Sequence, residues 1–201
     1  MKKNTLAIDI ETFSDLDLSK VGVYPYCNSP NFEILLFAYA FNDEEVKIVD
    51  LARKEKLPQY VIEALFDENI VKTAFNANFE RICIGAHLKT YLSPKAWKCT
   101  AVQGAMATLP SSLEKVGQVL NLENKKLKEG KDLIKFFSLL DKNNKRNLPV
   151  GNEEKYELFK KYCIRDVVVE REIRNKLKSF QLSPEEEEIY ILDQEINDRG
   201  N

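Results

Sequence analysis

The stretch Asn-Thr-Leu-Ala-Ile-Asp-Ile-Glu at residues 4–11 predicts a β-strand with two acidic residues near its end. Because successive side chains of a strand point to opposite faces, Asp9 and Glu11 share one face. Two neighbouring carboxylates repel each other and are costly to desolvate unless a cation neutralises them. A solvent-exposed strand end has the same pattern, so the pair alone is a weak indication of a metal site.

Further strand and helix patterns follow this first strand. Asp-Glu-Glu at residues 43–45 resembles a hairpin turn between two apolar runs. We expect strands at residues 33–42, 46–51 and 70–75, helices at residues 58–66 and 79–91, and a loop at residues 14–31.

The second half of the chain is predicted to be mainly helical. Ser-Ser-Leu-Glu at residues 111–114 is a capping-box pattern that opens a helix through about Leu120. Residues 153–180 contain few helix breakers and predict one long helix or two. Ser183 and Pro184, followed by glutamates, predict the start of a last helix, because acidic residues favour that end of the helix dipole. The order of elements predicts an α/β fold with a mixed sheet, antiparallel at one end and parallel at the other.

Length and composition indicate a globular chain. Its 201 residues, 44% hydrophobic and 31% charged, are enough to bury a substantial core. The longest apolar stretch, Ile34 to Phe41, is too short to cross a bilayer, and the N-terminus has no signal-peptide apolar region. We therefore expect a cytoplasmic protein that does not enter a membrane.

The cysteine pattern does not fit structural zinc. Zinc sites of that kind need about four Cys or His ligands at tight spacings, whereas this chain has one histidine and no Cys-x-x-Cys pair. In a cytosolic setting we expect four reduced, mostly buried thiols, at Cys27, Cys83, Cys99 and Cys163.

The net charge of −2 and the pI of about 5.7 do not suggest a protein that holds a long duplex. Either the chain binds no nucleic acid, or it contacts a few phosphates locally and lets metal ions supply positive charge. Eight basic residues could form a local patch, although each also fits a solvated helix or loop: Lys125, Lys126, Lys128, Lys131, Lys135, Lys142, Lys145 and Arg146.

A third acidic residue lies inside the long helix predicted near the C-terminus. Tyr162 and Asp166 are four residues apart, so they share a helix face. An acid directly before three valines is unusual in mid-helix. The alternative is a surface pairing or a salt bridge to Arg165 or Lys161, and it would be preferred if Asp166 stood without the first acidic pair.

Asn-Ala-Asn-Phe-Glu at residues 76–80 follows the strand expected at 70–75 and begins a helix. Glu80 could merely complement the helix dipole from the first turn. Its position just beyond the carboxyl end of a strand also suits a ligand, because ligand sites of α/β sheets gather there.

Together these three patterns resemble the exonuclease motifs of the DEDD superfamily. The resemblance is carried by Asp-x-Glu on a first strand, Asn-x-x-Phe-acid after a later strand, and Tyr-x-x-x-Asp on a late helix. The tyrosine form of the third motif is typical of proofreading domains of family A and B DNA polymerases. The histidine form needs a histidine where this chain has Lys161. The resemblance extends from about Thr5 to Phe180, and Cys99 replaces an aspartate that the family has before Thr100.

The chain is still more similar to the N-terminal part of phage family A polymerases. This similarity is carried by Ala-Ile-Asp-Ile-Glu-Thr-Phe-Ser at residues 7–14, Ala-Phe-Asn-Ala-Asn-Phe-Glu-Arg at 74–81, and Leu-Asp-Gln-Glu-Ile-Asn-Asp-Arg-Gly at 192–200. In such polymerases the last segment looks like the lead-in to the polymerising domain. The resemblance therefore implies an exonuclease domain at residues 1–180 and a C-terminal helix at 181–201 that leads toward a polymerase domain absent here.

The resemblance implies an RNase H-like fold, with a mixed five-stranded sheet flanked by helices. It also implies two Mg²⁺ or Mn²⁺ ions, which hard carboxylate oxygens suit. By this likeness, Asp9 bridges both ions, Glu11 and Asp166 hold the ion on the side of the nucleophile, and Glu80 holds the other, directly or through water. Tyr162 would orient the attacking water.

Some site residues are expected on weaker grounds. Glu80 departs from the superfamily's aspartate, and its extra methylene would move the carboxylate by roughly 1.5 Å. Phage relatives share this glutamate by resemblance, so we retain it as a ligand. Thr12 and Phe13 are placed to touch the terminal sugar and base, and Asn76 either holds the single strand or caps the helix.

The implied activity is that of a metal-dependent 3′→5′ exodeoxyribonuclease. It would release nucleoside 5′-monophosphates from single-stranded or frayed DNA 3′ ends, as the proofreading part of a DNA polymerase. We expect a monomer, located in the host cytoplasm if a phage encodes it. Two alternatives stay open, which are an RNA-trimming exonuclease and a degenerate domain that only binds nucleic acid or has a structural role.

Overall fold

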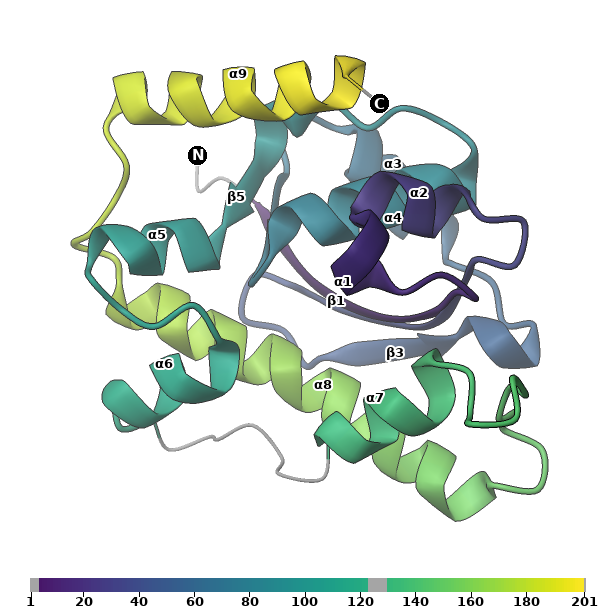
Figure 1. The fold of residues 1–201 in the computed structure, drawn as a ribbon. Coiled ribbons are helices and arrows are strands. Elements are labelled where there is room, and N and C mark those ends of the chain that lie inside the picture. Colours follow the sequence, from purple (N-terminus) through teal and green to yellow (C-terminus); the bar gives the residue numbers. More distant parts are fainter. Residues whose placement is uncertain (1–3, 123–129, 201) are drawn as a thin grey trace.

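The first strand lies at the centre of a five-stranded mixed sheet (Figure 1). The structure, a computed structural model, describes residues 4–122 and 130–200. The strand order is β3-β2-β1-β4-β5, with β1 antiparallel to β2 and parallel to β4. These arrangements confirm the predicted mixed sheet. The strands are β1 (Thr5–Phe13), β2 (Glu33–Phe41), β3 (Lys47–Asp50), β4 (Val71–Ala74) and β5 (Trp97–Cys99).

Helices cover both faces of this sheet (Figure 1). On one face α4 packs against β1 and β2, and on the other α8 and α7 pack against β1. The helices are α1 (Leu18–Val21), α2 (Val23–Asn28), α3 (Gln59–Phe66), α4 (Ala77–Leu88), α5 (Thr100–Met106), α6 (Leu113–Val119), α7 (Gly130–Ser138), α8 (Glu153–Lys176) and α9 (Pro184–Arg199), with short 3₁₀ turns η1 (Leu51–Arg53) and η2 (Pro94–Ala96). Within the described ranges, none of these helices has both the length and the apolar composition needed to span a membrane.

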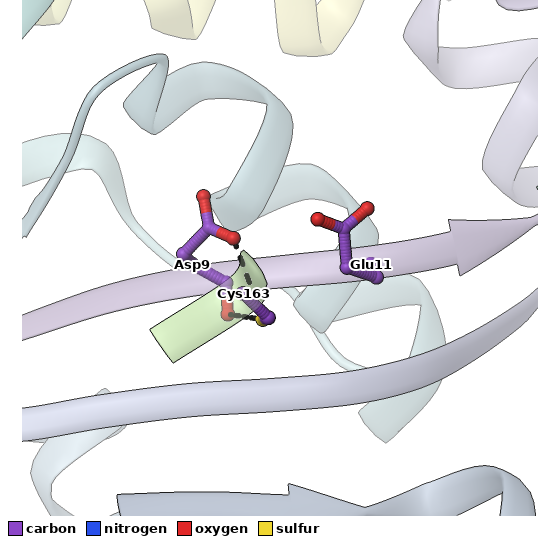
Figure 2. Close-up of side chains that lie close together, drawn as sticks. All are labelled: Asp9, Glu11 and Cys163. Atoms are coloured by element: carbon purple, nitrogen blue, oxygen red, sulfur yellow. Dashed lines mark hydrogen bonds between the residues drawn. The ribbon is translucent and has the colours of Figure 1, made fainter. Parts of the chain in front are cut away.

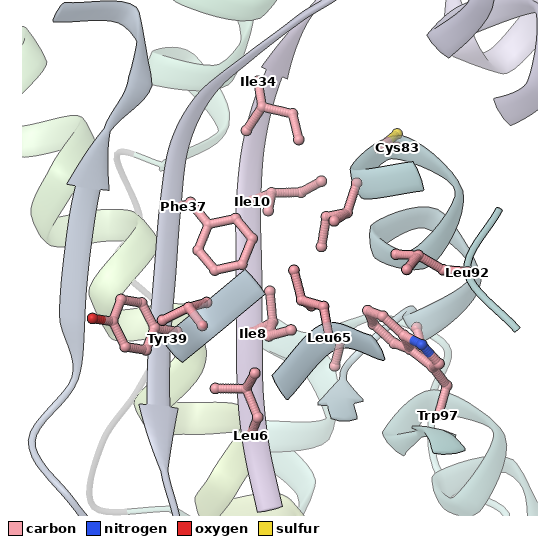
Figure 3. Packing of buried hydrophobic residues seen from close by; sticks show 14 of the residues in the cluster. Leu6, Ile8, Ile10, Ile34, Phe37, Tyr39, Leu65, Cys83, Leu92 and Trp97 are labelled. Atoms are coloured by element: carbon pink, nitrogen blue, oxygen red, sulfur yellow. The ribbon is translucent and has the colours of Figure 1, made fainter. Parts of the chain in front are cut away.

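The alternation of β1 separates its apolar side chains from its acidic ones. Leu6, Ile8 and Ile10 point into the hydrophobic cluster beneath α3 and α4, as Figure 3 shows. The intervening positions face the second cluster, to which α8 contributes Tyr162 and Cys163. Because a strand has a period of two, this register directs the acidic residues of β1 toward α8.

Residues 14–31 do not form the loop that we predicted. They contain α1 and α2, separated by Gly22 at φ 78°. Asp17 caps α1 by accepting a hydrogen bond from the Ser19 N–H, and Tyr26 and Cys27 anchor α2 in the core. The polar composition of the segment reflects these caps and the short length of the helices, which is why it resembles a loop.

The capping box predicted at Ser111 and Glu114 is also wrong. Ser112 is the N-cap of α6 and accepts from the Lys115 N–H, so Glu114 lies one position too early to complete the box. By contrast, the box at Ser183 is complete, because Glu186 bonds back to it. The region predicted as one long helix or two is the single helix α8.

The last helix, α9, is fixed to the rest of the chain by buried polar contacts. Arg81 of α4 donates to both carboxylate oxygens of Asp198, at 2.8 and 2.9 Å. Tyr24 and Tyr91 donate to the same carboxylate at 2.7 and 3.0 Å. Arg81 directly follows Glu80 in α4, so these hydrogen bonds connect the helix that carries Glu80 to α9.

Candidate active site

β1 brings Asp9 and Glu11 together on the face covered by α8, as the strand period predicted. A ligand atom from each of Asp9, Glu11 and Cys163 lies within 4.8 Å of the other two (Figure 2). The Cys163 thiol donates to Asp9, at 3.4 Å to the carboxylate and 3.6 Å to the backbone carbonyl. A residue of α8 thereby holds the orientation of the first acidic side chain.

Cys163 itself is a poor candidate for a metal ligand. Burial raises the pKa of its thiol well above the ordinary value, and the charges of Asp9, Glu11 and Asp166 raise it further. The thiol is therefore protonated in the metal-free protein, and hard cations such as Mg²⁺ prefer oxygen ligands to sulfur. Its role is that of a hydrogen-bond donor beside the carboxylates, and the sequence patterns did not identify it.

Asp166 is buried on α8, with 5% of its surface exposed. This burial contradicts the alternative of a solvated surface acid. The charges of Asp166, Glu11 and Asp9 all raise the pKa of the neighbouring Tyr162, so the three carboxylates lie within electrostatic range of one phenol. Acidic residues from β1 and α8 therefore converge on the same region.

Tyr162 is a buried phenol whose pKa is raised above its ordinary value. Burial is the largest cause that raises its pKa, followed by the charge of Asp166. The ring packs parallel to that of Phe159, with centroids 6.4 Å apart, and Gly130 lies against its edge. Any side chain at position 130 would overlap the ring, so glycine is required there. Tyr162 can orient a water through its hydroxyl but cannot act as a phenolate base.

Glu80 of α4 lies within electrostatic range of Asp9 and Asp166, but outside the group of ligand atoms that lie within 4.8 Å of one another. Only 5% of it is exposed, and its Oε2 atom has no hydrogen-bond partner among the described residues. Burial, and then the charge of Asp9, raise the pKa of Glu80 well above its usual range, and Glu170 and Asp166 contribute in the same direction. A buried carboxylate oxygen without a donor, among other acids, is a group that a cation would stabilise.

Replacing Glu80 by glutamine should stabilise the metal-free protein above acidic pH. The pKa of Glu80 is raised in the folded state, so protonation of this carboxyl stabilises the folded protein. This contribution to the free energy of unfolding is fully present below the ordinary pKa of 4.5, and it is lost as pH rises through the folded-state pKa. We expect the melting temperature of Glu80→Gln in EDTA to exceed that of the wild type increasingly between about pH 5 and pH 8. A constant difference across this range would contradict the assignment.

Of the three residues expected to contact substrate, Thr12 and Phe13 are buried and Asn76 is exposed. The Thr12 hydroxyl lies 2.7 Å from the Tyr26 hydroxyl inside the core, and the Phe13 ring is buried beneath Arg146. Asn76 is the N-cap residue of α4, but its side chain makes no capping hydrogen bond. Their contacts with substrate remain predictions.

One charged group that the sequence did not single out, Glu170, also borders the site. Glu170 is a further buried carboxylate, which accepts from Thr100 at 2.6 Å and from Arg174 at 3.2 Å.

Of the predicted basic patch, Lys125, Lys126 and Lys128 lie outside the described residues. Lys131 pairs with Glu114 at 2.9 Å, and Arg146 pairs with Glu33 at 2.7 Å.

The donor set fits a hard divalent cation. Asp9 and Glu11 offer carboxylate oxygens within 4.8 Å of one another, and Mg²⁺ and Mn²⁺ prefer such ligands to sulfur. Glu80 and Asp166 lie outside this group, although the charges of Asp9 and Asp166 both raise the pKa of Glu80. The four cysteines form no disulfides and are buried, as expected.

The strand order, and the carboxylates gathered from β1, α4 and α8, define an RNase H-like exonuclease fold. Solved nucleases share it at low sequence identity. Brucella melitensis NrnC bound to pGG matches with a TM-score of 0.58 at 14% identity, over 99% of this chain and 87% of NrnC. NrnC with bound Mg²⁺ matches with 0.54 at 15%, over 88% and 72%. Escherichia coli RNase D, an exoribonuclease, matches with 0.57 at 14%, over 94% and 44%.

A phage protein is much more similar to this chain in sequence. The DNA polymerase of Bacillus phage SP02 is 52% identical over 202 residues, which span 98% of this chain and 31% of the polymerase. No family model matches the chain. The protein is thus a homologue of part of a phage DNA polymerase, and it has the fold of DEDD exonuclease structures.

Proposed function

We propose that the chain is a 3′→5′ exonuclease that removes nucleoside 5′-monophosphates from single-stranded or frayed DNA 3′ ends. The observation that carries the proposal is that carboxylates of β1 and α8 lie in electrostatic range of the Tyr162 phenol, with the buried Glu80 of α4 in range of Asp9 and Asp166. The homology to a DNA polymerase favours DNA as the substrate and proofreading as the role. An unpaired terminus reaches such a site more readily, because freeing a mismatched base costs less.

In the proposed mechanism the acidic residues bind metal ions, and their neighbours on α8 position the carboxylate and the attacking water. Asp9, Glu11, Glu80 and Asp166 would hold two Mg²⁺ or Mn²⁺ ions. When bound, such ions lower the pKa of the attacking water and offset the charge that develops on the leaving 3′ oxygen. The Cys163 thiol fixes the Asp9 carboxylate, and the neutral Tyr162 hydroxyl orients the water for in-line attack.

The organisation of the longer protein is part of the same proposal. Residues 1–180 would form the exonuclease domain, and residues 181–201 would lead toward a polymerase domain of the same full-length chain. The two would work in the host cytoplasm, with this part as a monomer. Since the net charge is −2, we expect binding of isolated DNA to be weak and to fall steeply with salt.

The RNA-trimming alternative is supported by one specific comparison, since the fold neighbour RNase D acts on RNA. A direct assay distinguishes the candidates. Labelled single-stranded DNA and RNA would be incubated with the protein in Mg²⁺, Mn²⁺ or EDTA. Metal-dependent shortening of DNA from its 3′ end supports the proposal, preference for RNA overturns the proofreading role, and cleavage of neither substrate leaves a binding or structural module.

Tyr162→Phe should lower kcat by about 10- to 100-fold with little change in KM, because the water loses its orienting hydroxyl while substrate binding is retained. Steady-state kinetics on a labelled oligonucleotide would measure this. Tyr156→Phe is the matched control, since it is a buried tyrosine on the same helix whose hydroxyl instead donates to Asp50 at 3.0 Å. Equal losses in both variants would contradict a role for Tyr162 at the reacting water.

A further inference from the structure

Glu170 is a buried carboxylate to which the chemistry proposed above gives no role. Only 2% of it is exposed, and it lies four residues after Asp166 on the same face of α8. Its charge contributes to the raised pKa of Glu80, so it also lies in electrostatic range of an acidic residue of α4. Burial of a carboxylate is costly unless its partners compensate, so the contacts of Glu170 indicate what it does.

Two donors fix one oxygen of this carboxylate. Its Oε1 atom accepts from the Thr100 hydroxyl at 2.6 Å and from Arg174 Nε at 3.2 Å. The Oε2 atom has no hydrogen-bond partner in residues 4–122 and 130–200, so the donors on Oε1 set the orientation of the group. Thr100 is itself 2% exposed and is the first residue of α5. A short hydrogen bond in the interior therefore joins the start of α5 to α8.

Thr100 is in turn connected to the beginning of α4. The Ala101 N–H donates to the Phe75 carbonyl at 2.9 Å, and the Cys99 thiol donates to the same oxygen at 3.3 Å. Phe75 lies two residues before α4, which carries Glu80 in its first turn. The neighbours of Thr100 on both sides are thus bonded to the segment that leads into α4. The contact that begins on α8 continues in this way to the helix that carries Glu80.

The positions of Asp166 and Glu80 relative to each other depend on connections of this kind. The two residues belong to α8 and α4, which cover opposite faces of the sheet (Figure 1). Mg²⁺ requires near-ideal octahedral geometry, so ligands from separate elements need support from the residues behind them. The bond between Glu170 and Thr100 lies one turn of α8 beyond Asp166, where it provides such support.

We propose that Glu170 is a positioning residue for the proposed metal site, and that it acts through Thr100. Their hydrogen bond holds the start of α5, and with it the start of α4, at a fixed place relative to α8. The acidic residues of the two helices thereby stay in register. The inference rests on the proposed function, because it requires metal ions among the carboxylates. Glu170 itself would touch neither the ions nor DNA.

Binding of Mn²⁺ to the protein, measured by electron paramagnetic resonance, tests this role. Glu170→Ala and Thr100→Val each remove the hydrogen bond, and each should raise the dissociation constant for Mn²⁺ by about 10- to 100-fold. Glu170→Gln keeps an acceptor and Thr100→Ser keeps a donor, so both should stay within about threefold of the wild type. The kcat for a labelled DNA strand should follow the same order, with little change in KM.

Charge and position lead to different results for these variants. If Glu170 acted only through its charge, Glu170→Gln would lose as much affinity as Glu170→Ala while Thr100→Val bound like the wild type. That pattern would overturn the inference. Gln103→Ala is the matched control, because it removes another buried hydrogen bond of α5, to the Leu177 carbonyl at 2.9 Å. It should retain the wild-type affinity for Mn²⁺, and an equal loss there would contradict a specific role for Glu170.

Thermal melting in EDTA separates stability from position. Destabilised variants that bind Mn²⁺ like the wild type would show that Glu170 only supports the fold, and the inference would fail while the proposed function stands. If Glu170→Ala does not fold, the comparison of Thr100→Val with Thr100→Ser decides. If the wild type binds Mn²⁺ but cleaves neither DNA nor RNA, the proposed function fails and the binding data still decide the inference. A wild type that binds no Mn²⁺ would overturn both.

Discussion

Asp9→Asn should abolish metal-dependent cleavage, with a loss of at least about 1,000-fold in kcat/KM. Asp9 lies beside Glu11 and in electrostatic range of Glu80, so it is the residue placed to serve both proposed ions. Asparagine keeps the shape and an oxygen that can accept from Cys163, but it removes the charge that holds a cation. Single-turnover cleavage of a labelled DNA strand would measure the effect.

The stability of the same variant separates a ligand from a structural residue. In EDTA, Asp9→Asn should melt at the wild-type temperature or above it, because the substitution relieves repulsion among buried carboxylates. Asp43→Asn, an exposed aspartate in the turn after β2, should change neither activity nor stability. A large loss of stability in Asp9→Asn would show that Asp9 supports the fold and does not serve a metal.

Asp198→Ala should destabilise the protein by about 3 kcal/mol or more. The carboxylate of Asp198 is 9% exposed and its partner Arg81 3% exposed, and the pair is bidentate. Removing the acid leaves a buried guanidinium whose remaining hydrogen bonds, among residues 4–122 and 130–200, are to the Leu92 carbonyl and, at 3.4 Å, to Asn78. Urea unfolding monitored by circular dichroism would give the difference in the free energy of unfolding.

Glu195→Ala provides the control on the same helix. Glu195 pairs with the exposed Arg199 at 3.9 Å, and such surface pairs contribute about 0–1 kcal/mol. If both variants were destabilised equally, the loss would come from α9 itself and not from the buried pair.

The pH dependence of the Asp198 effect has a definite sign. Burial raises the pKa of Asp198, but hydrogen bonds from Arg81 and Tyr24 outweigh it, and the net pKa is lowered from the ordinary 3.8. The stabilisation is therefore present above that value and is lost as pH falls through the folded-state pKa. The difference between wild type and Asp198→Ala should be full at neutral pH and shrink in acid.

Local patterns in the sequence were sufficient for the central strand and for several helix starts. The alternation of residues 4–11 places Asp9 and Glu11 on one face whatever surrounds the strand, and the structure confirms it. The start of α9 was equally predictable, because its N-cap Ser183, Pro184 and the glutamates of the first turn are adjacent in sequence. Both features depend on neighbours within a single element.

Contacts between distant segments could not be read in the same way. Arg81 and Asp198 are 117 residues apart, and each alone resembles a solvated charge. Phe13 was expected to touch the terminal sugar and base, and the contact of its ring with Arg146 from a remote loop could not be read from the sequence. Strand β5 has three residues, too few for a strand period to be recognised, and it is defined by its pairing with β4.

The most direct test of the central claim is to locate manganese in a crystal of the protein soaked in Mn²⁺. Anomalous scattering should show two peaks among the carboxylates of Asp9, Glu11, Glu80 and Asp166, and both should vanish in Asp9→Asn. A single peak would contradict the two-ion mechanism. Strong manganese peaks elsewhere, with none among these four side chains, would contradict the account as a whole.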